Sequence, residues 1–307
     1  MVADPVVIFE TVHGSRAYGL DRAGSDLDLK GVIVGPPEWY FGWSGGPEQI
    51  EHSADHVQYE LRKFFRLCAG ANPTVMEVLF TAPEDHVVVT TLGRRLLAER
   101  DAFLSRRVAE RFGAYATAQL RRIRSHRSWL LAPPTAPPNR AAFGLPEHSV
   151  IPADQLAAAT ALLDDGRVAE ADVSVDFIEL LHRERRYKTA QQQWRQYQTW
   201  VRNRTPARAE LEARYGYDTK HAMHLVRLQR MAIEILRTGE VNVRRPDRDE
   251  LLAIRDGVWS YEDLEQRAEE TAAAIDDAVP TFPLPDHPDE DHLDALCVEM
   301  ISEALSC

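Results

Sequence analysis

The chain of 307 residues has few cysteines, no long apolar run and fewer basic than acidic residues. Its three cysteines, Cys68, Cys297 and Cys307, lack the spacing of a metal site or a disulfide framework, which favours a reducing, cytoplasmic compartment. No apolar stretch is long enough for a membrane-spanning helix. The N-terminus also lacks a basic segment followed by a long apolar one, so neither a membrane anchor nor a secretory signal is expected.

The deficit of positive charge limits the possible partners. With 36 basic and 48 acidic residues the net charge is −12, which argues against attraction of nucleic acid by the whole surface. Locally the balance is reversed, because residues 183–208 contain eight basic residues and one acid, Glu184. Four aromatic residues are interleaved with them: Tyr187, Trp194, Tyr197 and Trp200. This composition suits an RNA end, but the aromatic spacing also fits the inward face of an amphipathic helix.

The hydrophobic pattern divides the chain into a head of α+β class, residues 1–103, and an α-helical domain, residues 104–307. In the head the pattern predicts strands at 5–12, 27–34 and 56–59 and helices at 61–68, 74–80 and 91–99. A proline-rich break, residues 131–138, follows a long helix predicted at 105–131. Further helices are predicted at 153–163, 173–201, 206–215, 219–238, 260–278 and 292–304.

The most informative segment is HGSRAYGLDRAGSDLDLKG, residues 13–31. A predicted strand leads into the turn Gly14-Ser15, and ten residues later a second strand carries Asp26 and Asp28. Side chains at i and i+2 of a strand point to one face, so both carboxylates are directed together toward the turn. Free backbone N–H groups in such a turn suit phosphate, and paired carboxylates suit Mg²⁺ or Mn²⁺. The spacing therefore predicts metal-assisted transfer of a nucleotide.

Two metal ions need more than two carboxylates, so a third acid is expected nearby. Glu60, at the end of the strand predicted at 56–59, is the first candidate and Asp55, just before that strand, is the second. Glu60 has another interpretation, as a carboxylate stabilised at a helix N-terminus. Ser15 and the N–H groups of residues 14–16 would hold the β- and γ-phosphates, where Arg16 either adds charge or is simply solvated.

The segment GSRAYGLDRAGSDLDLKGV resembles the DNA polymerase beta-like nucleotidyltransferase superfamily, whose signature is Gly-Ser, a gap of about ten residues and Asp-x-Asp. Residues 59–80 and 215–231 are similar to one branch of it, named for an RNA repair pathway. The resemblance implies a small mixed sheet flanked by helices, Mg²⁺ dependence and a nucleoside triphosphate donor such as ATP. It carries metal roles onto Asp26 and Asp28, and phosphate roles onto Gly14 and Ser15.

The helix predicted at 219–238 carries a polar stripe. Lys220, His224 and Arg227 follow at i, i+4 and i+7 and so share one face. One interpretation is that this face contacts the triphosphate or binds an acceptor. The other is that it is a solvated face on which one histidine has its hydrogen bonds satisfied.

These features predict an enzyme that adds a nucleotide to an RNA 3′ end, with tRNA as one candidate acceptor. An acceptor that is a small molecule or a protein side chain is the alternative, favoured by the acidic net charge. A third hypothesis is a nucleotide-binding module without catalysis, which the intact Gly-Ser and Asp-x-Asp set argues against.

Overall fold

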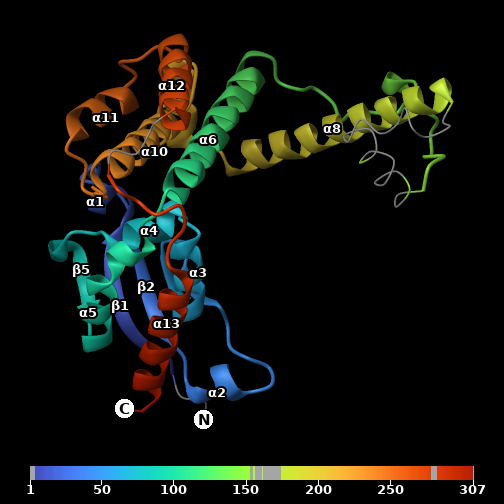
Figure 1. Ribbon diagram of the computed structural model, residues 1–307. Coiled ribbons are helices and arrows are strands. Elements are labelled where there is room, and N and C mark those ends of the chain that lie inside the picture. Colours follow the sequence, from blue (N-terminus) through green and yellow to red (C-terminus); the bar gives the residue numbers. More distant parts are fainter. Residues whose placement is uncertain (1–3, 153–154, 156–160, 162–173, 278–281, 307) are drawn as a thin grey trace. The chain divides into compact units, whose positions relative to one another are not determined.

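A five-stranded mixed sheet forms the centre of the head in the computed structural model (Figure 1). The structure describes residues 4–152, 155, 161, 174–277 and 282–306. The strands are β1 (Val6–His13), β2 (Asp28–Val34), β3 (Gln49–Ser53), β4 (His56–Glu60) and β5 (His86–Val89). Their order in the sheet is β3-β4-β2-β1-β5. Strands β2 and β4 are parallel, whereas β1 pairs antiparallel with β2 and β5, and β3 with β4. The α+β class and the mixed sheet predicted from the sequence are confirmed.

The sheet forms where β-branched and aromatic residues are concentrated. Ile8 and Phe9 of β1 and Val32 and Ile33 of β2 are fully buried, so the two central strands carry the apolar core. Strands β3 and β5 lie at the two edges of the sheet and are only partly buried. The pattern from the sequence missed both of them.

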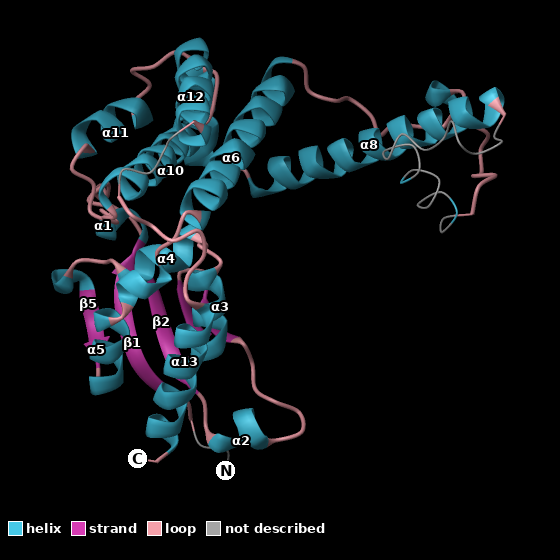
Figure 2. Ribbon diagram, in the orientation of Figure 1, coloured by secondary structure: helices cyan, strands magenta, loops and turns pink. Residues whose placement is uncertain are grey.

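Short helices follow strands β1, β2, β4 and β5 along the chain (Figure 2). Helix α1 (Gly14–Ala17) follows β1, and α2 (Pro37–Phe41) follows β2. Glu60 caps α3 (Leu61–Ala69), Asn72 caps α4 (Pro73–Leu79), and Thr90 caps α5 (Thr91–Ala98). Each cap accepts a hydrogen bond from a backbone N–H that would otherwise lack a partner in the first turn. Short 3₁₀ turns, η1 (Pro83–Asp85) and η2 (Arg100–Phe103), complete the head.

The rest of the described chain is helical. It contains α6 (Arg107–Leu131), η3 (Ala141–Phe143), α8 (Val175–Asn203), α9 (Pro206–Tyr215), α10 (Thr219–Thr238), α11 (Arg248–Arg255), α12 (Tyr261–Asp276) and α13 (Glu290–Leu305). The sequence predicted most of these, but it missed α11. The helix predicted at 153–163 falls almost entirely outside the described residues. No described helix combines the length and the apolar character that a membrane span requires.

The contacts divide the chain into two compact units. Unit 1 contains residues 1–123 and 219–307, and unit 2 contains residues 124–218. Unit 1 therefore combines the sheet with α10 to α13, which come from the far end of the chain. The boundary at residue 103 that the composition predicts lies inside unit 1, and as a functional boundary it stays a prediction.

Candidate active site

The turn between β1 and α1 is built around Gly14. Its backbone has φ +66°, a left-handed conformation that glycine adopts without strain. A Cβ atom at this position would lie 2.0 Å from Oδ2 of Asp28. Glycine is therefore needed at position 14 for two reasons: the backbone has a left-handed φ, and a Cβ atom would clash with the Asp28 carboxylate. The turn that the sequence predicts for phosphate and the first residue of β2 lie in direct contact.

Asp28 lies opposite His13 in the β1–β2 pair, and Asp26 lies two residues earlier, in the exposed loop. Partial burial raises the pKa of Asp28, and the neighbouring carboxylates of Asp55 and Asp26 raise it further. His13 and Lys30 act in the opposite direction. A carboxyl pKa raised by like charges marks a place where negative charge is concentrated, and a divalent cation would relieve that repulsion.

Arg16 fixes the position of the Asp26 loop. Its guanidinium donates to the backbone carbonyl of Ser25 at 2.9 Å and to that of Asp26 at 3.3 Å. These bonds tie the backbone of the loop at Ser25 and Asp26 to α1, close enough to Asp28 for the charge of Asp26 to act on it. In the structure Arg16 fixes the backbone of this loop, and its contact with phosphate stays a prediction.

The strand register separates the two candidates for the third carboxylate. In the parallel pair of β2 and β4, Leu29 lies beside His56 and Ile33 beside Glu60. Asp55 therefore lies at the same end of the pair as Asp28, and its backbone carbonyl accepts a hydrogen bond from the N–H of Leu29 at 2.7 Å. Asp28 and Ile33 are an odd number of positions apart, which places Glu60 at the other end and on the other face.

The carboxylate of Glu60 is also buried and already accepts several hydrogen bonds. The residue is 2% exposed, and its carboxylate accepts from the N–H groups of Arg62 at 3.1 Å and Lys63 at 3.4 Å. The hydroxyl of Tyr40 donates to it at 3.1 Å. Glu60 thus has the capping role that the sequence offered as its alternative interpretation. The structure does not bring it together with Asp26 and Asp28.

A buried network of four side chains supports the turn from behind. The Tyr18 hydroxyl donates to Oε2 of Glu77 at 2.6 Å, and Nε2 of His13 lies 3.5 Å from the same oxygen. Arg227 of α10 pairs with the other carboxylate oxygen of Glu77 and stacks over the Tyr18 ring at 3.8 Å. Burial raises the pKa of Glu77, but Arg227, His13 and Tyr18 lower it more, to about 2. This network joins α4, the turn and α10.

The predicted polar stripe of α10 is only partly directed toward solvent. Arg227 is buried in the network, and Lys220 and His224 lie near it along the helix. Burial lowers the pKa of His224 to about 3, and the charges of Arg227 and Lys220 lower it in the same direction. His224 is therefore a neutral imidazole at physiological pH. It offers a hydrogen bond to a ligand and no charge.

Residues from the end of α10 to the end of α11 fix the loop after α1, a feature that the sequence did not reveal. The N–H of Arg245 donates to the carbonyl of Tyr18 at 3.1 Å. The guanidinium of Arg248 donates to the carbonyl of Gly19 at 2.5 Å, and that of Arg255 to Leu20 at 3.3 Å. The only hint of this contact in the sequence was the clustering of arginines at 244–255. The residues that they bind lie more than 200 positions earlier, and no local sequence pattern connects the two segments.

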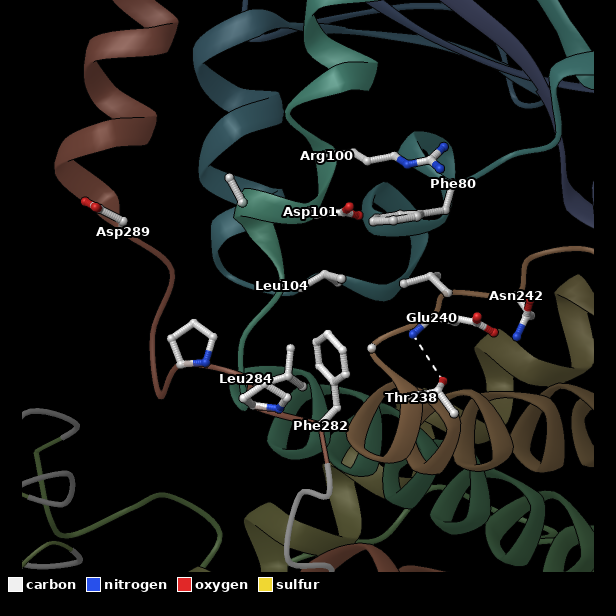
Figure 3. A pocket seen from close by; sticks show the side chains of 15 residues that line it. Phe80, Arg100, Asp101, Leu104, Thr238, Glu240, Asn242, Phe282, Leu284 and Asp289 are labelled. Carbon is white, nitrogen blue, oxygen red and sulfur yellow. Dashed lines mark hydrogen bonds between the residues drawn. The ribbon is translucent and has the colours of Figure 1, made fainter.

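A separate cavity lies elsewhere in unit 1, with a volume of about 780 Å³ (Figure 3). Phe80, Arg100, Asp101, Glu240 and Phe282 are among its lining residues. None of the predicted site residues lines it, so this cavity is distinct from the site at the turn.

The acidic groups at the turn fit Mg²⁺ in chemistry, because all are hard oxygen donors. Among the described residues, no three His, Cys, Asp or Glu side chains already surround one point as a metal site would require. A metal ion held by Asp26 and Asp28 would therefore take further ligands from phosphate oxygens and water, as Mg²⁺ commonly does.

Comparison with known proteins supports the resemblance seen in the sequence. Residues 3–130 match a family model, RlaP, described as the RNA repair pathway DNA polymerase beta family. The uncharacterized protein YcgL of Bacillus subtilis (strain 168) is 34% identical over 77 residues. That match covers 24% of this chain and 30% of YcgL, so the chain spans less than a third of that relative. No solved structure matches.

Proposed function

Because residues 3–130 match the RNA repair pathway branch of the DNA polymerase beta-like nucleotidyltransferases, we propose that this chain transfers a nucleotide from a nucleoside triphosphate to an RNA 3′ end. The observation that carries the proposal is the contact between Gly14 and Asp28. The Asp28 carboxylate, near the charges of Asp26 and Asp55, lies against the turn whose N–H groups would hold phosphate. An enzyme of this class needs both within one triphosphate length.

In the proposed reaction the RNA 3′ hydroxyl attacks the α-phosphorus and pyrophosphate leaves. The N–H groups of Gly14 and Ser15 hold the β- and γ-phosphates and keep the leaving group in line. Asp26 and Asp28 would hold Mg²⁺ or Mn²⁺, and the ion would supply neutralisation of the charge on the phosphates. Asp55, exposed beside Asp28, completes the acidic set and accepts the proton of the attacking hydroxyl.

Two residues of α10 complete the proposed site. Lys220 is the candidate for charge-assisted contact with the phosphates. His224 is held neutral, with a pKa of about 3, and would contribute a hydrogen bond. Both would act from a helix that the Glu77 and Arg227 pair joins to α4.

The test is transfer of label from each α-labelled nucleoside triphosphate to total RNA by the purified protein, with Mg²⁺ or Mn²⁺. We expect label on RNA, its loss in excess EDTA, and its loss in the double variant Asp26→Asn and Asp28→Asn. Turnover that survives EDTA would contradict the metal role. Folding of the double variant is checked by its thermal unfolding, since both side chains are exposed or partly exposed.

The net charge of −12 favours a different acceptor, a small molecule or a protein side chain. The same experiment separates the two. Label that appears in protein or in small molecules, with none on RNA, would replace the RNA acceptor and leave the nucleotidyl transfer in place. If no product carries label with any of the triphosphates, the result would instead support a nucleotide-binding module without catalysis.

A further inference from the structure

His13, the last residue of β1, is the cross-strand neighbour of Asp28. The two residues lie directly opposite each other in the antiparallel pair of β1 and β2. Side chains at such positions share one face of the sheet, with Cβ atoms about 4.5–5.5 Å apart. The next residue, Gly14, packs against the Asp28 carboxylate from the turn. The imidazole of His13 therefore lies beside the carboxylate that is proposed to bind the metal ion.

The ring of His13 is buried and fixed in place. The residue is 5% exposed, and its ring meets the ring of Tyr18 edge-on, with 5.6 Å between the ring centres. Its Nε2 atom lies 3.5 Å from Oε2 of Glu77, and the same oxygen accepts a hydrogen bond from the Tyr18 hydroxyl. His13 is thus the member of the buried network that the strand pairing sets opposite Asp28.

Filling space in the core would not by itself require a histidine at position 13. A contact of 3.5 Å is longer than an ordinary hydrogen bond, and among the described residues Nε2 of His13 has no hydrogen-bond partner. A buried polar atom without such a partner costs free energy, which a phenylalanine of similar shape would avoid. His86, partly buried in β5, differs, because its Nε2 lies 3.2 Å from the carbonyl oxygen of Thr81. The unmet hydrogen-bonding capacity of His13 points to a role other than packing.

The electrostatics of Asp28 agree with this placement of His13. Burial raises the pKa of Asp28, and the Asp55 carboxylate raises it further. Among the groups that lower this pKa, His13 has the largest effect, ahead of Lys30. The interaction of two charges weakens as the distance between them grows, so the ring of His13 is close enough to act on the Asp28 carboxylate.

We infer that His13 is a positioning residue for Asp28: it keeps the Asp28 carboxylate in place for a divalent ion and connects it with the pair of Glu77 and Arg227. The inference rests on the proposed function above. His13 acts through Asp28, and it neither ligates the ion nor contacts the triphosphate. Neighbours that support a metal-binding carboxylate in this way typically contribute about 10–100-fold to metal affinity. The buried network then supports the acidic set as well as the turn.

Binding of Mn²⁺ to the full-length protein tests this inference. It is measured by electron paramagnetic resonance, first without nucleotide and then with a non-hydrolysable ATP analogue. His13→Phe keeps the volume of the ring and removes its polar edge, so the Kd for Mn²⁺ is expected to rise about tenfold or more. His13→Gln keeps a polar side chain and should recover part of the affinity. His86→Phe is the matched control, because it changes a partly buried histidine of the same sheet, and it should bind Mn²⁺ like the wild type.

A double-mutant cycle separates positioning from a general loss of structure. In the Asp28→Asn background, His13→Phe should cause little further loss of Mn²⁺ affinity, because the residue through which it acts is already changed. Equal losses in both backgrounds, or wild-type affinity in His13→Phe, would overturn the inference and leave the proposed function in place. No Mn²⁺ binding by the wild type, or binding that Asp28→Asn leaves unaltered, would instead remove the proposed metal role and this inference together. Thermal unfolding of each variant checks that it is folded.

Discussion

A methyl group at position 14 would occupy the space of the Asp28 carboxylate. The backbone there is left-handed as well, so alanine meets both strain and a clash. Gly24 offers a comparison within the same loop, because its φ of +83° is also left-handed, but a Cβ atom there would have no other atom within 4 Å. Replacing either glycine therefore costs the strain of a left-handed backbone, but only at position 14 does the new side chain also clash with Asp28.

Gly14→Ala is expected to lower kcat/KM by about a hundredfold or more, because it displaces the carboxylate proposed to bind the metal ion by about an ångström. Gly24→Ala should lower the free energy of unfolding by about 1 kcal/mol and leave activity per folded molecule near the wild type. Kinetics and thermal unfolding of both variants check this. Equal activity losses in both would show that backbone strain, and not the contact with Asp28, is what matters.

Substitutions of Asp55 and Glu60 are expected to have opposite effects, one on kcat and the other on the free energy of unfolding. Asp55→Asn should reduce kcat by about a hundredfold or more with stability unchanged, since the side chain is exposed. Glu60→Gln should lower the free energy of unfolding by about 1 kcal/mol through a weaker cap on α3, with little change in kcat. Chemical denaturation and steady-state kinetics measure the two quantities. A large fall in kcat for Glu60→Gln alone would return the third carboxylate to Glu60.

At the scale of elements, α4 and α10 are joined by a buried ion pair. Glu77 and Arg227 are 1% and 4% exposed, and Glu77 also accepts from Tyr18. Removing one member of such a pair leaves the other charge buried without compensation, which costs about 3–5 kcal/mol. We therefore expect Glu77→Gln to be strongly destabilising, and Tyr18→Phe to cost only about 1 kcal/mol. Urea denaturation of each variant measures these values.

The same pair makes stability depend on acid. The pKa of Glu77 is lowered from 4.5 to about 2 in the folded protein, so its contribution is complete above pH 4.5. As the pH falls from 4.5 to about 2, the contribution of about 3 kcal/mol is lost, because the unfolded chain binds the proton first. The free energy of unfolding measured across this range should fall more steeply for the wild type than for Glu77→Gln. Parallel curves for the two proteins would contradict the role of Glu77.

Some helices and strands could be predicted because the sequence that marks them is local, and others could not. Helices α3, α4 and α10 were predicted to within about one residue because caps and apolar spacing mark them. Strand β3 was missed because it is polar and half exposed, without clean alternation. Strand β5 was missed because its apolar run, His86–Val89, is only four residues long.

The candidate site shows the same division. Gly14 and Asp28 are close together in the sequence, and their contact agrees with the predicted turn and strand. The prediction that the same strand also carries Asp26 was wrong, because β2 begins at Asp28 and Asp26 lies in the exposed loop before it. The choice between Asp55 and Glu60 depended on the register of β2 against β4, which one sequence does not reveal. The network of Glu77 and Arg227 joins residues 150 positions apart and was likewise not visible.

For the whole molecule, the match to the family model ends at residue 130, but unit 1 does not. Helix α10 supplies Arg227, and the segment after it fixes Tyr18, Gly19 and Leu20 through the backbone. A polypeptide ending at residue 130 would expose the surface of α3 against which α13 packs and would leave Glu77 without its partner Arg227.

We expect that polypeptide to lack cooperative thermal unfolding and to bind a hydrophobic dye, whereas the full chain unfolds in a single transition for unit 1. Circular dichroism and dye fluorescence of the two proteins check this. Cooperative unfolding of the shorter polypeptide would show that the family segment folds without the C-terminal helices.

The division of unit 1 into two distant stretches of chain has a consequence for biosynthesis. The turn at Gly14 leaves the ribosome early, but Arg227, Arg245 and Arg248 follow only after more than 200 further residues have been joined. Until then the nascent polypeptide holds its acidic pair on an unsupported loop. For the proposed transfer, competence to react with a triphosphate is therefore expected only late in translation, after the arginines that secure that loop have emerged.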